Sequence, residues 1–169
     1  MDVTGRSFIA ALHCATPRKT AVVDYVRSAE IAGDGWLVQG RESQHELLLR
    51  FDYLFHSENR AHFNISGART AGKFAQAKLG VSLNGFLGLY HTASVTDEWK
   101  LEIVSGSDVT GRFEFYLRDH RGYRVGSVEL PRPEPFFQPN PGHFSNTLNY
   151  LSVEEGVVAR FTATITQFV

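Results

Sequence analysis

The chain has 169 residues, of which 43% are hydrophobic and 12% aromatic, enough for one packed domain over residues 1–169. Its 17 basic and 18 acidic residues give a formal net charge of −1, and neither sign forms a long run. Nucleic-acid grooves and anionic membrane surfaces need concentrated positive charge, so this balance argues against nucleic acid or a membrane surface as partner.

The distribution of cysteine and of apolar residues predicts where the protein resides. Cys14 is the single cysteine, which excludes an internal disulfide. The apolar run over residues 8–15 contains His13 and lacks a basic segment before it, so we expect no cleaved signal peptide. No apolar run approaches the roughly 18 residues that span a bilayer. We therefore expect a soluble, cytoplasmic protein without a transmembrane segment; export without a cleaved signal is compatible with the same features.

The first third of the chain is typical of β-strands. Residues 6–14 and 20–31 are rich in β-compatible side chains, although a helix over 20–31 is the alternative. The turn at 33–35 should fold residues 36–39 back onto the preceding strand. Residues 46–55 alternate most clearly, and their odd-numbered side chains should line one core face: Leu47, Leu49, Phe51, Tyr53 and Phe55.

After a short strand at 62–66, the stretch 75–93 consists of two alternating runs joined by Asn84-Gly85. This dipeptide is the strongest short-range hairpin signal, because a type I′ turn needs positive φ at both central residues. We expect the first strand to begin at Ala75; a helical stripe over 71–79 is the alternative. The turn predicts these cross-strand pairs: Leu83 with Phe86, Val81 with Gly88, Leu79 with Tyr90 and Ala77 with Thr92.

Four further runs, at residues 99–104, 112–118, 123–130 and 157–168, alternate in the same way. The sequence thus predicts about nine to eleven strands and no helix longer than two turns. Such a pattern is typical of an all-β, single-domain antiparallel β-sandwich of jelly-roll type, and a closed antiparallel β-barrel is the alternative.

The segment 131–147 holds five of the six prolines. Proline donates no backbone hydrogen bond, so this segment should run over the surface as a long loop. Its aromatic side chains either staple the loop onto the sheet or form a ligand platform or an oligomer contact. The candidate ligand-binding residues are Phe136, Phe137, His143 and Phe144 in this loop, together with Trp36 and Tyr123 elsewhere in the chain; Trp99 and Tyr116 are further exposed-aromatic candidates.

No motif for catalysis, for a cofactor or for a metal is present in the sequence. His45, His56 and His62 lack the spacing of a β-sheet metal site, so we expect no metal. His13 and Cys14 point to opposite faces of a strand and form no dyad. Arg50 and Asp52 would face the lumen if the fold were a barrel with a pocket, but a solvated outer face is the simpler interpretation.

These features favour a non-catalytic ligand-binding domain that binds a carbohydrate or a protein through loop aromatics, as lectins do. One alternative is a small β-barrel enzyme or carrier with an apolar pocket for a lipid-like or polyketide-like molecule. Another is a structural subunit of a homo-oligomer.

Overall fold

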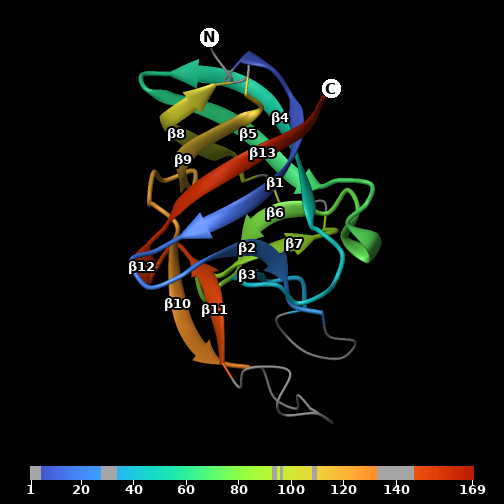
Figure 1. The fold of residues 1–169 in the computed structure, drawn as a ribbon, viewed down its shortest axis with the longest axis vertical. Coiled ribbons are helices and arrows are strands. Elements are labelled where there is room, and N and C mark those ends of the chain that lie inside the picture. Colours follow the sequence, from blue (N-terminus) through green and yellow to red (C-terminus); the bar gives the residue numbers. More distant parts are fainter. Residues whose placement is uncertain (1–4, 28–33, 93–94, 96, 108–109, 133–146) are drawn as a thin grey trace.

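The computed structural model of this protein describes residues 5–27, 34–92, 95, 97–107, 110–132 and 147–169. The described chain is all-β: thirteen strands form one continuous antiparallel sheet, which confirms the predicted fold class (Figure 1). Within these ranges the helical structure is a single 3₁₀ turn, Gly72–Phe74, and no helix is long and apolar enough to cross a membrane. The strands are β1 Phe8–Ala15, β2 Thr20–Tyr25, β3 Leu37–Gln39, β4 Leu48–Ser57, β5 Arg60–Gly67, β6 Lys78–Val81, β7 Leu87–Tyr90, β8 Trp99–Ser107, β9 Arg112–Arg118, β10 Gly126–Pro131, β11 Thr147–Ser152, β12 Val157–Val158 and β13 Arg160–Phe168.

Six of these strands close into a barrel in the order β1, β13, β9, β8, β5 and β4. The strand β1 closes it, because its first half pairs with β4 while its whole length pairs with β13. The second half of β1 pairs instead with β2, which leads into a smaller sheet of β2, β3, β11, β10 and β12. In Figure 1 the barrel is the upper part and this smaller sheet the lower part. The fold therefore contains a closed barrel that opens into a second sheet.

The barrel interior is filled by aromatic side chains, and every barrel strand contributes at least one. The Phe8 ring stacks on Phe51 with centroids 4.7 Å apart and meets Phe113 edge-on at 5.7 Å. Burying a side chain of this size contributes about 2–3 kcal/mol to folding, so these residues form the main driving force. The residues that fill the interior at 0–1% exposure are Phe8, Phe51, Phe63, Trp99, Phe113, Phe115 and Phe161.

The central hairpin forms, but its predicted register was wrong by one residue. Leu79 lies opposite Leu89, and Val81 lies opposite Leu87. The turn has three residues rather than two: the Gly85 N–H donates to the Ser82 carbonyl, and the Ser82 N–H donates to the Phe86 carbonyl. Gly85 has a φ of +84°, whereas Asn84 does not have positive φ. This is a type I turn closed by a glycine bulge.

The shift exchanges the two faces of the second strand, because side chains alternate along a strand. Leu83, which was expected on the apolar face, is fully exposed at 103%. Tyr90 faces away from Leu79, opposite Lys78, and its ring lies against Gly80 and Gly88. The observed register places Leu87 and Leu89 on the same face as Leu79 and Val81, whereas the two-residue turn would have placed Leu87 and Leu89 on the opposite face. The strand also begins at Lys78, after the 3₁₀ turn, and not at Ala75.

Two further differences come from features that alternation does not reveal. A β-bulge between Tyr53 and Phe55 moves Phe55 to the outer surface, so its predicted place in the core was wrong. The strand β11 was not predicted, because its residues follow the proline-rich segment directly. Of the predicted loop 131–147, only the two ends are described, and Pro131 and Thr147 pair with each other in β10 and β11.

The turn geometry predicts different outcomes for substitutions at Gly85 and at Asn84. Changing Gly85 to Ala should destabilise the protein by about 1–2 kcal/mol, because an L side chain is strained at this φ and its Cβ would approach Glu154. Changing Asn84 to Ala should alter the unfolding free energy by less than about 0.5 kcal/mol. Urea denaturation of both variants measures the difference. Equal losses in the two variants would instead indicate the two-residue type I′ turn.

Candidate functional site

The outer surface of β5, β8 and β9 carries a row of charged and aromatic side chains. The cross-strand register places Arg60 opposite Glu102 and Glu102 opposite Tyr116. Arg160, at the start of β13, extends the row, because its Nη2 lies 3.5 Å from the Tyr116 hydroxyl. The Arg124 guanidinium covers the Tyr116 ring at 3.9 Å from the centroid. These side chains point outward because their strand neighbours fill the barrel interior.

Glu102 binds two of the arginines on this surface. Its carboxylate accepts hydrogen bonds from Arg118 Nε at 2.6 Å and from Arg124 Nη2 at 2.9 Å. Partial burial by itself raises the pKa of Glu102, but the hydrogen bonds and charges of the two arginines outweigh it and lower the pKa. Glu102 therefore remains ionised and fixes both guanidinium groups in place.

A four-residue turn after β9 adds two more side chains. Asp119 is 1% exposed, and its carboxylate accepts the backbone N–H groups of Arg121 and Tyr123 at 3.0 and 2.9 Å. The same carboxylate accepts Arg121 Nε at 3.0 Å, and the Arg121 guanidinium lies 4.8 Å from the Tyr123 ring centroid. Tyr123 is 57% exposed. The buried aspartate thus presents an exposed tyrosine with an arginine against one face of its ring.

We call this surface the Arg–Tyr face. It combines six basic with three acidic side chains, in a chain whose formal net charge is −1. The basic residues are spread over about a hundred positions of the sequence, so no run of charges predicts that they form one surface. Strand pairing alone brings them together. The face consists of Arg60, Lys100, Glu102, Glu114, Tyr116, Arg118, Asp119, Arg121, Tyr123, Arg124 and Arg160.

The largest cavity described is an open groove of about 710 Å³ over the outer side of β1, β4, β5 and β13. Arg50 and Asp52 line it, and Arg50 Nε lies 2.9 Å from an Asp52 carboxylate oxygen. Both side chains are therefore on the solvated outer face and not in a barrel lumen. The groove is lined by aliphatic, amide and charged side chains and by no aromatic one.

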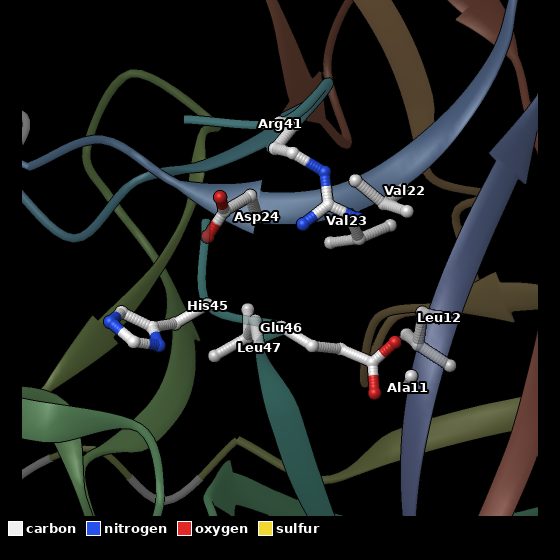
Figure 2. A pocket seen from close by; sticks show the side chains of 9 residues that line it. All are labelled: Ala11, Leu12, Val22, Val23, Asp24, Arg41, His45, Glu46 and Leu47. Atoms are coloured by element: carbon white, nitrogen blue, oxygen red, sulfur yellow. The ribbon is translucent and has the colours of Figure 1, made fainter. Parts of the chain in front are cut away.

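A much smaller cavity lies between β1, β2 and the segment that joins β3 to β4. Figure 2 shows the side chains of Arg41, His45 and Glu46 around the space beside Asp24. Its volume of about 10 Å³ suits at most one water molecule. Asp24 is 2% exposed, and its carboxylate accepts the backbone N–H groups of Glu42 and Ser43 at 2.8 and 3.2 Å. This arrangement anchors the joining segment and leaves no room for a substrate.

The aromatic residues predicted as a ligand platform fall into three groups. Phe136, Phe137, His143 and Phe144 lie outside the described residues. Trp36 is half-buried and packs on Phe86 and Tyr150, with centroids 4.7 and 5.9 Å away. Trp99 is fully buried, and its indole N–H donates to the Leu79 carbonyl at 2.9 Å, so it belongs to the core. Tyr123 is thus the exposed member of the described set.

Metal binding and cysteine chemistry are the two other possibilities considered from the sequence. In the described part of the chain, no three His, Cys, Asp or Glu side chains gather to hold a metal. Cys14 is fully buried, and burial raises its pKa to about 12, so the thiol stays protonated and unreactive at neutral pH.

No protein-family model, no curated protein and no solved structure matches this chain. The function of this protein therefore has to be inferred from the positions and chemistry of its residues.

The lowered pKa of Glu102 predicts that the free energy of unfolding depends on pH. Changing Glu102 to Gln should lower the unfolding free energy at pH 7 by about 1–2 kcal/mol, because two arginines lose their carboxylate. The pKa of Glu102 is depressed, so its contribution is present above its unfolded value of 4.5 and is lost as the pH falls through the folded value.

Urea denaturation between pH 7 and pH 3.5 should therefore show the wild type and E102Q converging at acidic pH. The matched control is Glu114→Gln, because the Glu114 carboxylate is more exposed and lies 3.5 Å from Arg160. A gap between wild type and E102Q that does not change with pH would contradict this role of Glu102.

Proposed function

We propose that this protein is a binding domain that holds an acidic polysaccharide, with carboxylate or sulfate groups, against the Arg–Tyr face. The exposed Tyr123 ring, with Arg121 against it and the Glu102-anchored arginines beside it, is the observation that carries the proposal. Sugar rings stack on exposed aromatic side chains, and arginine binds carboxylate and sulfate through its planar donors.

The charges and rigidity of the face support an anionic ligand over a neutral one. Its arginines are fixed before binding: Arg118 by Glu102 and the Gly122 carbonyl, and Arg124 by Glu102 and the Tyr116 ring. Fixed donors lose little conformational entropy when a ligand binds, so they contribute more to affinity than mobile side chains. Three more basic than acidic side chains leave this surface positive toward an approaching polyanion.

The other functions considered from the sequence receive less support. A carrier with an apolar interior needs a cavity, whereas aromatic side chains fill the barrel. The 710 Å³ groove has volume for a ligand, but it offers no aromatic ring on which a sugar could stack. Homo-oligomerisation stays a prediction from the sequence.

Calorimetric titration with a sulfated polysaccharide tests the proposal. We expect binding that weakens steeply with salt, and no binding of neutral dextran. Changing Tyr123 or Arg160 to Ala should each lower the affinity about fivefold to tenfold, which corresponds to about 1.0–1.4 kcal/mol. Both side chains are exposed, so the fold should be retained.

Arg69→Ala is the matched control, because it removes the same charge at the far end of β5, beside the 710 Å³ groove. Affinity should be unchanged in R69A. A loss in R69A with none in R160A would move the site to the groove. Equal or tighter binding of single-stranded DNA would overturn the choice of a polysaccharide as ligand.

A further inference from the structure

Three side chains from separate segments meet on the outer surface beside the Arg–Tyr face. The Ser57 Oγ lies 2.6 Å from His62 Nε2, and His62 Nδ1 lies 3.3 Å from a Glu98 carboxylate oxygen. Ser57 ends β4, His62 belongs to β5, and Glu98 directly precedes β8. Sequence separations of 5 and 36 residues gave no motif that would reveal this set.

The β-bulge in β4 makes the meeting possible. Before the bulge, Phe51 and Tyr53 point toward the interior, and uninterrupted alternation would have sent Phe55 and Ser57 the same way. After it, Phe55 pairs with His62, which is on the outer side of β5, and Ser57 pairs with Arg60. Ser57 therefore lies diagonally across from His62, within reach of its ring. Bulges are frequent beside active sites because they redirect a side chain in this way.

The position of Glu98 determines which nitrogen of the neutral His62 ring carries the proton. An ionised carboxylate only accepts hydrogen bonds, so in neutral His62 the proton lies on Nδ1, facing Glu98. The Nε2 atom is then left as an acceptor, and the Ser57 hydroxyl donates to it. This is the arrangement in which a histidine can remove a proton from a serine hydroxyl.

The exposure of Ser57 and the burial of His62 suit a reaction with a dissolved substrate. Ser57 is exposed, whereas His62 is only 4% exposed and is covered by the Phe55 ring, stacked at 4.2 Å. Phe55 is itself 47% exposed and offers an apolar surface directly beside the serine. Glu58, the residue after Ser57, has a φ of +53°, as expected in the two-residue turn that joins β4 to β5.

We propose that this protein hydrolyses small acyl esters, with Ser57 as nucleophile, His62 as general base and acid, and Glu98 as the residue that positions His62. Ser57 Oγ attacks the ester carbonyl and forms a new C–O bond, while its proton passes to His62 Nε2. The bond to the leaving alcohol breaks, and His62 gives that alcohol the proton. Water then attacks the acyl group in the same way, the acid is released, and the proton returns to Ser57. This proposal does not depend on polysaccharide binding.

Covalent labelling with a fluorophosphonate tests the nucleophile directly, because the reagent phosphonylates a serine activated by histidine. Intact-mass and peptide analysis of the folded chain should find one adduct, on Ser57, and p-nitrophenyl acetate should be hydrolysed. Ser57→Ala should abolish both, while Ser105→Ala, at an exposed serine of β8, should change neither.

Two substitutions separate catalysis from a merely structural hydrogen-bond network. His62→Gln should slow labelling about 100-fold or more. Glu98→Gln should slow it at least about tenfold, because its amide can donate to Nδ1 and favour the wrong tautomer, and Glu98→Asp should restore part of the rate. Unchanged melting temperatures for E98Q and E98D would confirm that the fold is intact.

Unlabelled Ser57 in the folded wild type would overturn the proposal. So would labelling that proceeds at the same rate in H62Q. Unchanged polysaccharide binding in Y123A, together with normal labelling of Ser57, would leave this proposal standing and count only against the proposed binding function.

Discussion

Closure of six strands around a phenylalanine-rich interior is the constraint on which the rest of the structure depends. Each barrel strand must point alternate side chains inward, and apolar side chains fill the interior, where an unpaired polar group would be costly. The charged side chains on these strands therefore point outward. The outer surface of the barrel, and not its lumen, is where charges and nucleophiles gather.

The strand β1 joins this barrel to the smaller sheet. Its first half pairs with β4 and its second half with β2, while β13 runs along both. One strand thus serves two sheets, which explains why the same chain has features of a barrel and of a sandwich. Gln39, at the end of β3, reinforces the junction: its side-chain amide donates to the carbonyls of Cys14 and Lys19 and its oxygen accepts from Ser127.

The two proposed sites occupy neighbouring parts of the same outer surface. His62 lies opposite Lys100 in the register, and Lys100 lies opposite Arg118 of the Arg–Tyr face. Both sites use a buried or half-buried group to hold an exposed one: Asp119 orients the turn that carries Tyr123, and His62 holds Ser57. In both, a rigid sheet supplies the geometry and strand pairing brings together residues that are distant in the sequence.

The sequence by itself determined the fold class and most of the core. Alternation in residues 112–118 places Phe113, Phe115 and Leu117 on one face of a strand, and all three are buried. Alternation is a local property, set by the two-residue repeat of a strand, so it can be read without knowing the partner strand.

Only the tertiary structure decided the turn register at Gly85, the bulge before Phe55, and the grouping of Ser57 with His62 and Glu98. A turn with one residue more, or a strand with one extra residue, reverses every face that follows, and the sequence signals for either are weak. Contacts between strands depend on which strands pair. That choice is made by packing the whole core at once, and no local stretch of sequence encodes it.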